Sequence, residues 1–161
     1  MYKFDYEKCL SEFSRKFKDE YVMLIRLHPN ILDRSTELGI EGKDGVYNAS
    51  FYPDMQELLV ASDILITDYS SSMFDFALTK KPCFIYASDI KNYSDDRGFY
   101  FDLEKLPFVI STDTKELLSN ISLFNIDKYN KEVNGFLVQQ GCVDDGYASK
   151  RVVDWIEKNI R

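Results

Sequence analysis

The stretch Leu65-Ile66-Thr67-Asp68-Tyr69-Ser70-Ser71-Ser72 joins an apolar strand to the start of a helix. The apolar run 64–66 is typical of a central strand in a parallel sheet, and helical spacing follows it at Met73, Phe74, Ala77 and Leu78. In parallel α/β sheets, ligands bind at the carboxyl ends of the strands, where N–H groups of the next helix favour anions. The three serines add hydroxyl donors of little bulk, so the junction predicts a phosphate-type anion site.

A helix cap is a second explanation for part of the same junction. Ser72 and Asp75 have the Ser-x-x-Asp spacing of a capping box, which needs no ligand. The cap gives no role to Asp68, Ser70 or Ser71. Both interpretations therefore stand at the level of the sequence.

Helical and extended patterns alternate through the rest of the chain. Helical spacing is found at 6–17, 54–59, 114–121, 126–136 and 148–160, and extended runs are found at 22–25, 45–48, 83–86, 99–101 and 108–110. The run 22–25 is expected to be buried on both faces. The alternation predicts an α/β fold with one doubly wound, mostly parallel, Rossmann-like sheet in a single domain of residues 1–161. The segment 87–107 is expected to be a long functional loop.

Composition narrows the functional classes. The chain carries 27 acidic and 20 basic side chains, a formal net charge of -7, which opposes nucleic acid or an anionic membrane as a partner of the whole surface. The three cysteines are far apart and lack C-x-x-C spacing, so a disulfide framework and a thiolate zinc site are not predicted, and a reducing cytoplasm fits best. A cytoplasmic location is also expected because no signal core or bilayer-spanning stretch is found.

His28 is the only histidine, and it follows the predicted strand 22–25 within Arg26-Leu27-His28-Pro29. The end of that strand should lie at the same sheet edge as the serines, although a lone histidine is often only a structural hydrogen bonder. Arg26 should point to the same face and could bind a phosphate or pair with a surface acid. The sequence lacks a G-x-S-x-G elbow, both glycine-rich nucleotide loops and any clustered metal-ligand spacing.

Several segments, taken in order, resemble the CDP-glycerol glycerophosphotransferase family of teichoic acid synthesis. They are Arg26-Leu27-His28-Pro29, 54–59, 62–71, Phe74-Asp75, Lys81-Pro82 and Arg97-Gly98-Phe99-Tyr100. The resemblance extends from about Tyr21 to the segment 145–149 and the helix after it. It implies the carboxyl-terminal, Rossmann-like, donor-binding half of a GT-B transferase.

The resemblance also implies an activity and a set of site residues. Family members move glycerol phosphate from CDP-glycerol to a hydroxyl of a membrane-linked acceptor or growing polymer and release CMP, without a required metal or cofactor. By position, His28 would stabilise the departing CMP phosphate, and the three serines would hold the pyrophosphate. The other implied donor-site residues are Arg26, Pro29, Asp68, Asp75 and Arg97. Arg26 or Arg97 would offset the charge of the pyrophosphate. Asp68 and Asp75 would orient hydrogen-bond donors or bind the hydroxyls of the donor substrate. CDP-ribitol would present the same pyrophosphate, so the donor alcohol stays open.

A second histidine, proposed as the base in that family, belongs to the acceptor-side half, which this sequence does not include. The resemblance therefore implies that these residues act with that half on a polyol-phosphate or capsular polymer or a lipid-linked acceptor. Peripheral contact with the inner face of the cytoplasmic membrane would come through the same half. The alternative is a CDP-alcohol-binding module without catalysis that acts with a separate acceptor-domain partner.

Overall fold

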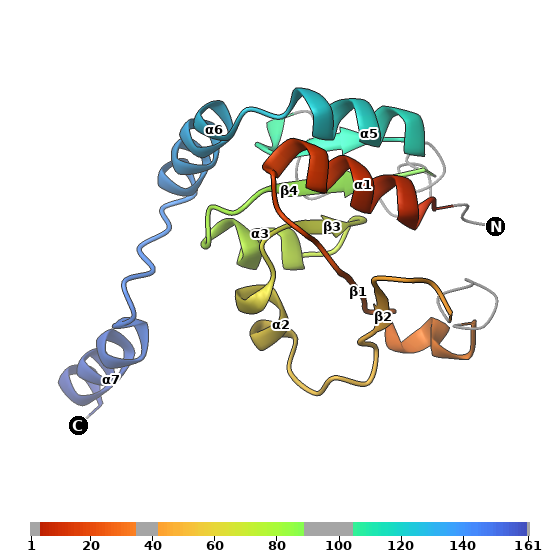
Figure 1. The fold of residues 1–161 in the computed structure, drawn as a ribbon. Coiled ribbons are helices and arrows are strands. Elements are labelled where there is room, and N and C mark those ends of the chain that lie inside the picture. Colours follow the sequence, from red (N-terminus) through yellow and green to blue (C-terminus); the bar gives the residue numbers. More distant parts are fainter. Residues whose placement is uncertain (1–3, 35–41, 89–104, 161) are drawn as a thin grey trace.

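The computed structural model describes residues 4–34, 42–88 and 105–160 (Figure 1). In chain order the elements are α1 (Tyr6–Phe17), β1 (Met23–Ile25), the 3-10 helix η1 (Pro29–Arg34), β2 (Val46–Asn48), α2 (Met55–Ala61), β3 (Leu65–Thr67), α3 (Ser72–Ala77), β4 (Cys83–Tyr86), β5 (Val109–Ser111), α5 (Thr114–Leu123), α6 (Ile126–Gln139) and α7 (Ala148–Asn159). This alternation confirms the predicted α/β class. The strand predicted at 99–101, most of the loop predicted at 87–107 and Arg97 lie outside the described residues.

The strands of the described residues form two parallel sheets. β1 pairs with β2, and β3, β4 and β5 form a three-stranded sheet in that order. The parallel, Rossmann-like α/β architecture is as predicted, but within the described residues the strands do not form one continuous sheet, and β3 is an edge strand because β4 is the middle one. Its residues Cys83, Phe84 and Ile85 are fully buried, whereas all of β3 is half-buried. Apolar patterning reports burial but not which strands exchange hydrogen bonds, so it carries no signal for the break between β1 and β3.

β1 also differs from its prediction. It is not buried on both faces, because Met23 packs against the core whereas Leu24 is 47% exposed. Tyr47, the register partner of Leu24 on β2, is 56% exposed. No described segment therefore gives one face of the β1–β2 pair the cover that a parallel sheet normally has.

Helices pack on both faces of the three-stranded sheet. Figure 1 shows α1 and α5 on one side and α3 with α2 on the other, in agreement with the contacts between α1 and α5 and between α3 and β3. The core centres on Phe84, whose ring lies 5.9 Å from that of Phe13 and 5.1 Å from that of Phe124. Burial of such aromatic side chains is the main stabilising term for the domain.

Two aspartate caps fix where helices begin. Asp54 Oδ1 accepts from the backbone N–H of Gln56 (2.7 Å) and Glu57 (3.2 Å) at the start of α2. Asp113 Oδ1 accepts from the N–H of Glu116 (2.8 Å) at the start of α5. Each cap pairs orphan N–H groups of the first turn, so these helices begin where the sequence predicts.

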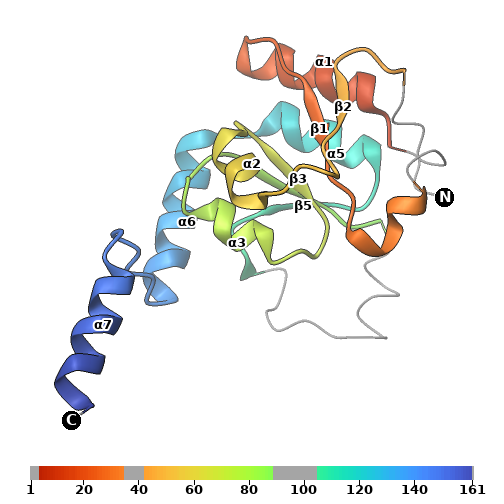
Figure 2. The same ribbon diagram turned by 90° about the horizontal axis from the view of Figure 1, so that it is seen from below.

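The helix α7 stands apart from the rest of the molecule in both ribbon views (Figures 1 and 2). None of its residues is buried. The apolar side chains expected on one face of this segment are exposed, and they include Val152, Ile156 and Ile160. Across 4–34, 42–88 and 105–160, no helix is both long and apolar enough to cross a membrane.

Candidate functional site

The turn between β3 and α3 places the three serine hydroxyls differently. The Ser70 hydroxyl oxygen accepts from the Ser72 hydroxyl (3.0 Å) and from the Ser72 N–H (3.3 Å). Ser72 is only 8% exposed, whereas Ser70 and Ser71 are exposed. Ser71 is the N-cap residue, and its side chain makes no capping hydrogen bond. The hydroxyls of Ser70 and Ser71 are therefore the groups of this turn that face solvent and can donate to a ligand.

The capping box expected from Ser72 and Asp75 does not form. α3 begins at Ser72 itself, so Ser72 occupies the first helical position instead of the N-cap. The N–H groups of Met73 and Phe74 bond the carbonyls of Ser70 (3.2 Å) and Ser71 (2.9 Å). The expectation of unpaired N–H groups at this helix start is also wrong, because the turn is tight enough to use them internally. An anion would have to be held mainly by hydroxyl groups here.

His28 lies after β1 and is exposed. Its Nδ1 accepts the backbone N–H of Asn30 (3.2 Å), and its carbonyl accepts the N–H of Ile31 (2.9 Å). A neutral imidazole that accepts at Nδ1 carries its proton on Nε2, by assignment from this hydrogen bond. The ring therefore presents an N–H donor to solvent, which suits contact with a phosphate oxygen better than it suits removal of a proton.

Arg26 is half-buried, and within the described residues it forms no ion pair with a surface acid. Its guanidinium donates to the backbone carbonyl of Tyr52, and the N–H of Leu27 donates to Ser50 Oγ (3.0 Å). These bonds tie the segment after β1 to the segment after β2. A guanidinium has five N–H donors, so one carbonyl leaves others for an anion.

The remaining predicted site residues are placed separately. Pro29 starts η1, and Asp68 and Asp75 are exposed on either side of the serines. Asp75 bonds through its backbone carbonyl, which accepts from the N–H of Leu78 (3.3 Å). Among the described parts of the chain, no group of three or more His, Cys, Asp or Glu side chains is placed to hold a metal ion.

The structure places the carboxyl ends of β1 and β3 at one end of the molecule. In Figures 1 and 2, η1 and the β3–α3 turn both lie on the right-hand side. His28 follows the two-stranded sheet, however, and the serines follow the three-stranded one. No hydrogen bond within the described segments joins the imidazole to a serine, so a ligand would have to bridge the two groups.

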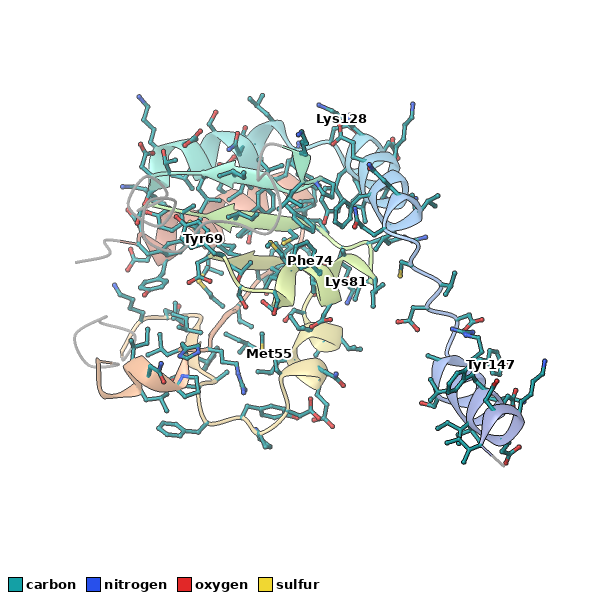
Figure 3. All side chains as sticks on the ribbon, turned by 180° about the vertical axis from the view of Figure 1, so that it is seen from behind. Met55, Tyr69, Phe74, Lys81, Lys128 and Tyr147 are labelled. Carbon is teal, nitrogen blue, oxygen red and sulfur yellow. The ribbon has the colours of Figure 1, made fainter. Side chains whose placement is uncertain are left out.

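Lys81, which the sequence shows only as part of the Lys81-Pro82 motif, has a structural role. Its Nζ donates to the carbonyls of Val60 (2.9 Å) and Ser62 (2.8 Å) at the end of α2. Figure 3 shows Tyr69 toward one end of the sheet and Lys81 toward the other. Because Lys81 precedes β4, it lies at the amino ends of the strands, away from the serine turn. The two carbonyls lie 21 and 19 residues earlier in the chain, so no local sequence pattern signals this role.

Comparison with known proteins finds the same family over nearly the whole chain. A family model described as CDP-glycerol:poly(glycerophosphate) glycerophosphotransferase matches residues 1–158. A teichoic acid poly(glycerol phosphate) polymerase of Staphylococcus epidermidis is 36% identical over 167 residues, covering 99% of this chain and 22% of the relative. A teichoic acid poly(ribitol-phosphate) polymerase of Bacillus spizizenii is 35% identical over 144 residues, covering 88% of this chain and 23% of the relative.

Solved structures of the wall teichoic acid polymerase TagF share the fold. One matches with a TM-score of 0.67 and 37% identity, covering 98% of this chain and 39% of that chain. A TagF variant soaked with CDPG matches with a TM-score of 0.69 and 34% identity, covering 97% of this chain and 39% of that chain. The chain thus spans only part of the length of these relatives.

Proposed function

The chain belongs to the CDP-glycerol:poly(glycerophosphate) glycerophosphotransferase family, and on this premise we propose that residues 1–161 form the donor-binding domain of such a transferase. The donor is CDP-glycerol or CDP-ribitol. The acceptor is a hydroxyl of a teichoic-acid-like or capsular polymer, or of a lipid-linked starter, and the product released is CMP. The acceptor-side half of the transferase completes the site, and through it the protein works at the cytoplasmic face of the membrane.

One observation carries the proposal: exposed hydroxyl donors follow β3, and an exposed imidazole N–H donor follows β1. The hydroxyls of Ser70 and Ser71 would hold the donor pyrophosphate. His28 Nε2 would donate to the phosphate that remains with CMP. The relative soaked with CDPG is a TagF variant whose fold matches 97% of this chain, which supports the choice of donor.

The reaction places a physical demand that these groups can meet. The acceptor oxygen bonds to the distal phosphorus, the bond from that phosphorus to the bridging oxygen breaks, and negative charge grows on the CMP phosphate. Fixed donors aimed at that oxygen stabilise the transition state more than the ground state. His28 therefore acts as a donor to the leaving group, and the proton of the acceptor hydroxyl goes to a base in the other half. Arg26, Asp68, Asp75, Pro29 and Arg97 complete the proposed donor site.

The test is calorimetric titration of the chain with CDP-glycerol, CDP-ribitol and CMP. Ser71→Ala and His28→Ala should each weaken binding of CDP-glycerol by about tenfold, because a hydrogen bond to a charged group contributes roughly 1.5–3 kcal/mol. Ser119→Ala, an exposed serine in α5, is the matched control and should bind like the unchanged chain. If none of the three ligands binds, or if both site variants bind like the control, the donor-site assignment is wrong.

A further inference from the structure

A cavity lies on the other side of the three-stranded sheet from the serine turn. It has a volume of about 640 Å³ and lies between the start of α1, the start of α5 and Lys43 ahead of β2. α5 follows β5 directly, so this cavity opens at the carboxyl ends of the strands, as the serine turn does. The two sites therefore share one edge of the sheet but lie against opposite layers of helices.

The cavity is locally basic on a chain of net charge -7. Its walls carry the ammonium groups of Lys8, Lys43 and Lys115. Asp5 also lines it, but both carboxylate oxygens are engaged: Oδ1 accepts from the Lys8 N–H (3.2 Å), and Oδ2 pairs with Lys8 Nζ (2.8 Å). Glu7 is the other acid in the wall. Lys43 and Lys115 are therefore left to face an incoming ligand.

Lys43 forms no ion pair within the described residues, although it lies near Asp5, whose pKa is lowered mainly by its hydrogen bonds to Lys8 and also by the charge of Lys43. Lys43 is half-buried, and its Nζ lies 5.8 Å from the centroid of the Tyr6 ring, within the range of a cation–π contact. None of the ion pairs found in 4–34, 42–88 and 105–160 includes Lys43 or Lys115. A partly desolvated ammonium that forms no close ion pair favours an anion more than a fully exposed one does.

The ring of Phe4 adds an apolar wall and fixes the shape of the cavity. It lies 5.1 Å from the Tyr6 ring and 5.2 Å from the Tyr86 ring, the latter in an edge-to-face contact. The cavity thus combines apolar surface with two ammonium groups. That combination suits a chain of alternating carbon backbone and phosphate better than it suits a free inorganic ion, which needs no apolar surface.

We infer that this cavity is a subsite for a phosphodiester segment of the polyol-phosphate polymer, held by Lys43 and Lys115 against Tyr6 and Phe4. The inference rests on the proposed function, which supplies the polymer as the acceptor. A polymer whose reacting end lies at the serine turn can follow the sheet edge to this cavity. The subsite would hold the polymer beyond its reacting hydroxyl and takes no part in the chemical step.

The test is titration of the chain with a defined oligomer of glycerol phosphate, with CDP-glycerol and with inorganic phosphate. The double variant Lys43→Ala with Lys115→Ala should weaken oligomer binding about fivefold, equivalent to ~1 kcal/mol, and leave CDP-glycerol binding unchanged. Oligomer binding should also weaken as salt is raised, because exposed ammonium groups are screened.

The matched control is Lys128→Ala with Lys150→Ala, which removes the same charge from α6 and α7 at side chains that are 75% and 67% exposed. Equal weakening in both double variants would mean a non-specific charge effect and would overturn the subsite. So would an oligomer that does not bind, or inorganic phosphate that binds as tightly as the oligomer with the same dependence on the two lysines. Because CDP-glycerol is titrated separately, failure of the donor site is distinguished from failure of this subsite.

Discussion

Replacing Ser70 and Ser71 one at a time separates the effect of the serine turn on stability from its effect on ligand binding. Ser70→Ala removes the acceptor of two hydrogen bonds, from the Ser72 hydroxyl at 3.0 Å and from the Ser72 N–H at 3.3 Å. A net intramolecular hydrogen bond contributes about 0.5–1.5 kcal/mol, and the longer bond is the weaker, so we expect a loss of about 1–2 kcal/mol in the free energy of unfolding. Ser72 is 8% exposed, so little water can replace the lost partner.

Ser71→Ala is the internal comparison because Ser71 is exposed and its side chain makes no capping bond. Its free energy of unfolding should change by no more than about 0.5 kcal/mol, while its affinity for CDP-glycerol should fall. Urea unfolding measures the first quantity and calorimetry the second, and for a chain of this size the Ser70 change corresponds to a melting point lower by about 2–8 °C. Equal stability of the two variants would refute the distinction between the hydrogen-bonded hydroxyl of Ser70 and the hydroxyl of Ser71, which makes no capping bond.

Four further outcomes follow from the packing. Lys81→Ala should lower the free energy of unfolding, measured in urea, by about 1–2 kcal/mol, because the two carbonyls at the end of α2 lose their hydrogen-bond donor. The affinity for CDP-glycerol should not change. Weaker binding of CDP-glycerol at equal stability would instead place Lys81 in the donor site. Phe84→Ala should cost about 3–5 kcal/mol, read from the urea midpoint, because the ring is fully buried; a loss below about 1 kcal/mol would contradict its central place in the core. Burial raises the pKa of Cys9 and of Cys83 to about 12, so a thiol reagent at pH 8 should modify only the exposed Cys142 in the folded chain and all three cysteines after unfolding. Above about pH 9 these two thiols ionise only in the unfolded chain, because burial raises both pKa values in the folded one. The free energy of unfolding should therefore fall as the pH rises above about 9. A free energy of unfolding that is flat from pH 8 to pH 10 would contradict the burial of Cys9 and Cys83.

The helices and strands were largely predictable from local patterns. The repeat of Tyr6, Leu10, Phe13 and Phe17 marks α1, and Asp54 and Asp113 mark the starts of two other helices through the N–H groups they accept. Such signals are local because a cap or a helical face involves residues within a few positions of one another. For the same reason the α/β class could be predicted without coordinates.

The arrangement of the strands needed the tertiary structure. The apolar run that becomes β1 has a continuous hydrophobic pattern, yet Leu24 is exposed because one face of the β1–β2 pair has no cover within the described residues. The last helix likewise has a clear apolar face, and the part of the chain that the structure describes buries none of it. Amphipathic spacing states that a face can be buried, but it does not state by what.

The sequence alone determined the family, the alternation of elements and the cluster of hydroxyls after the strand that ends at Thr67, because each of these is a property of neighbouring residues or of ordered motifs. Only the tertiary structure decided which hydroxyls remain free, which nitrogen of His28 carries the proton, and that Lys43 and Lys115 meet in one cavity. The physical reason is that hydrogen-bond partners and charge clusters depend on which distant segments approach one another, and one-dimensional spacing does not encode that approach.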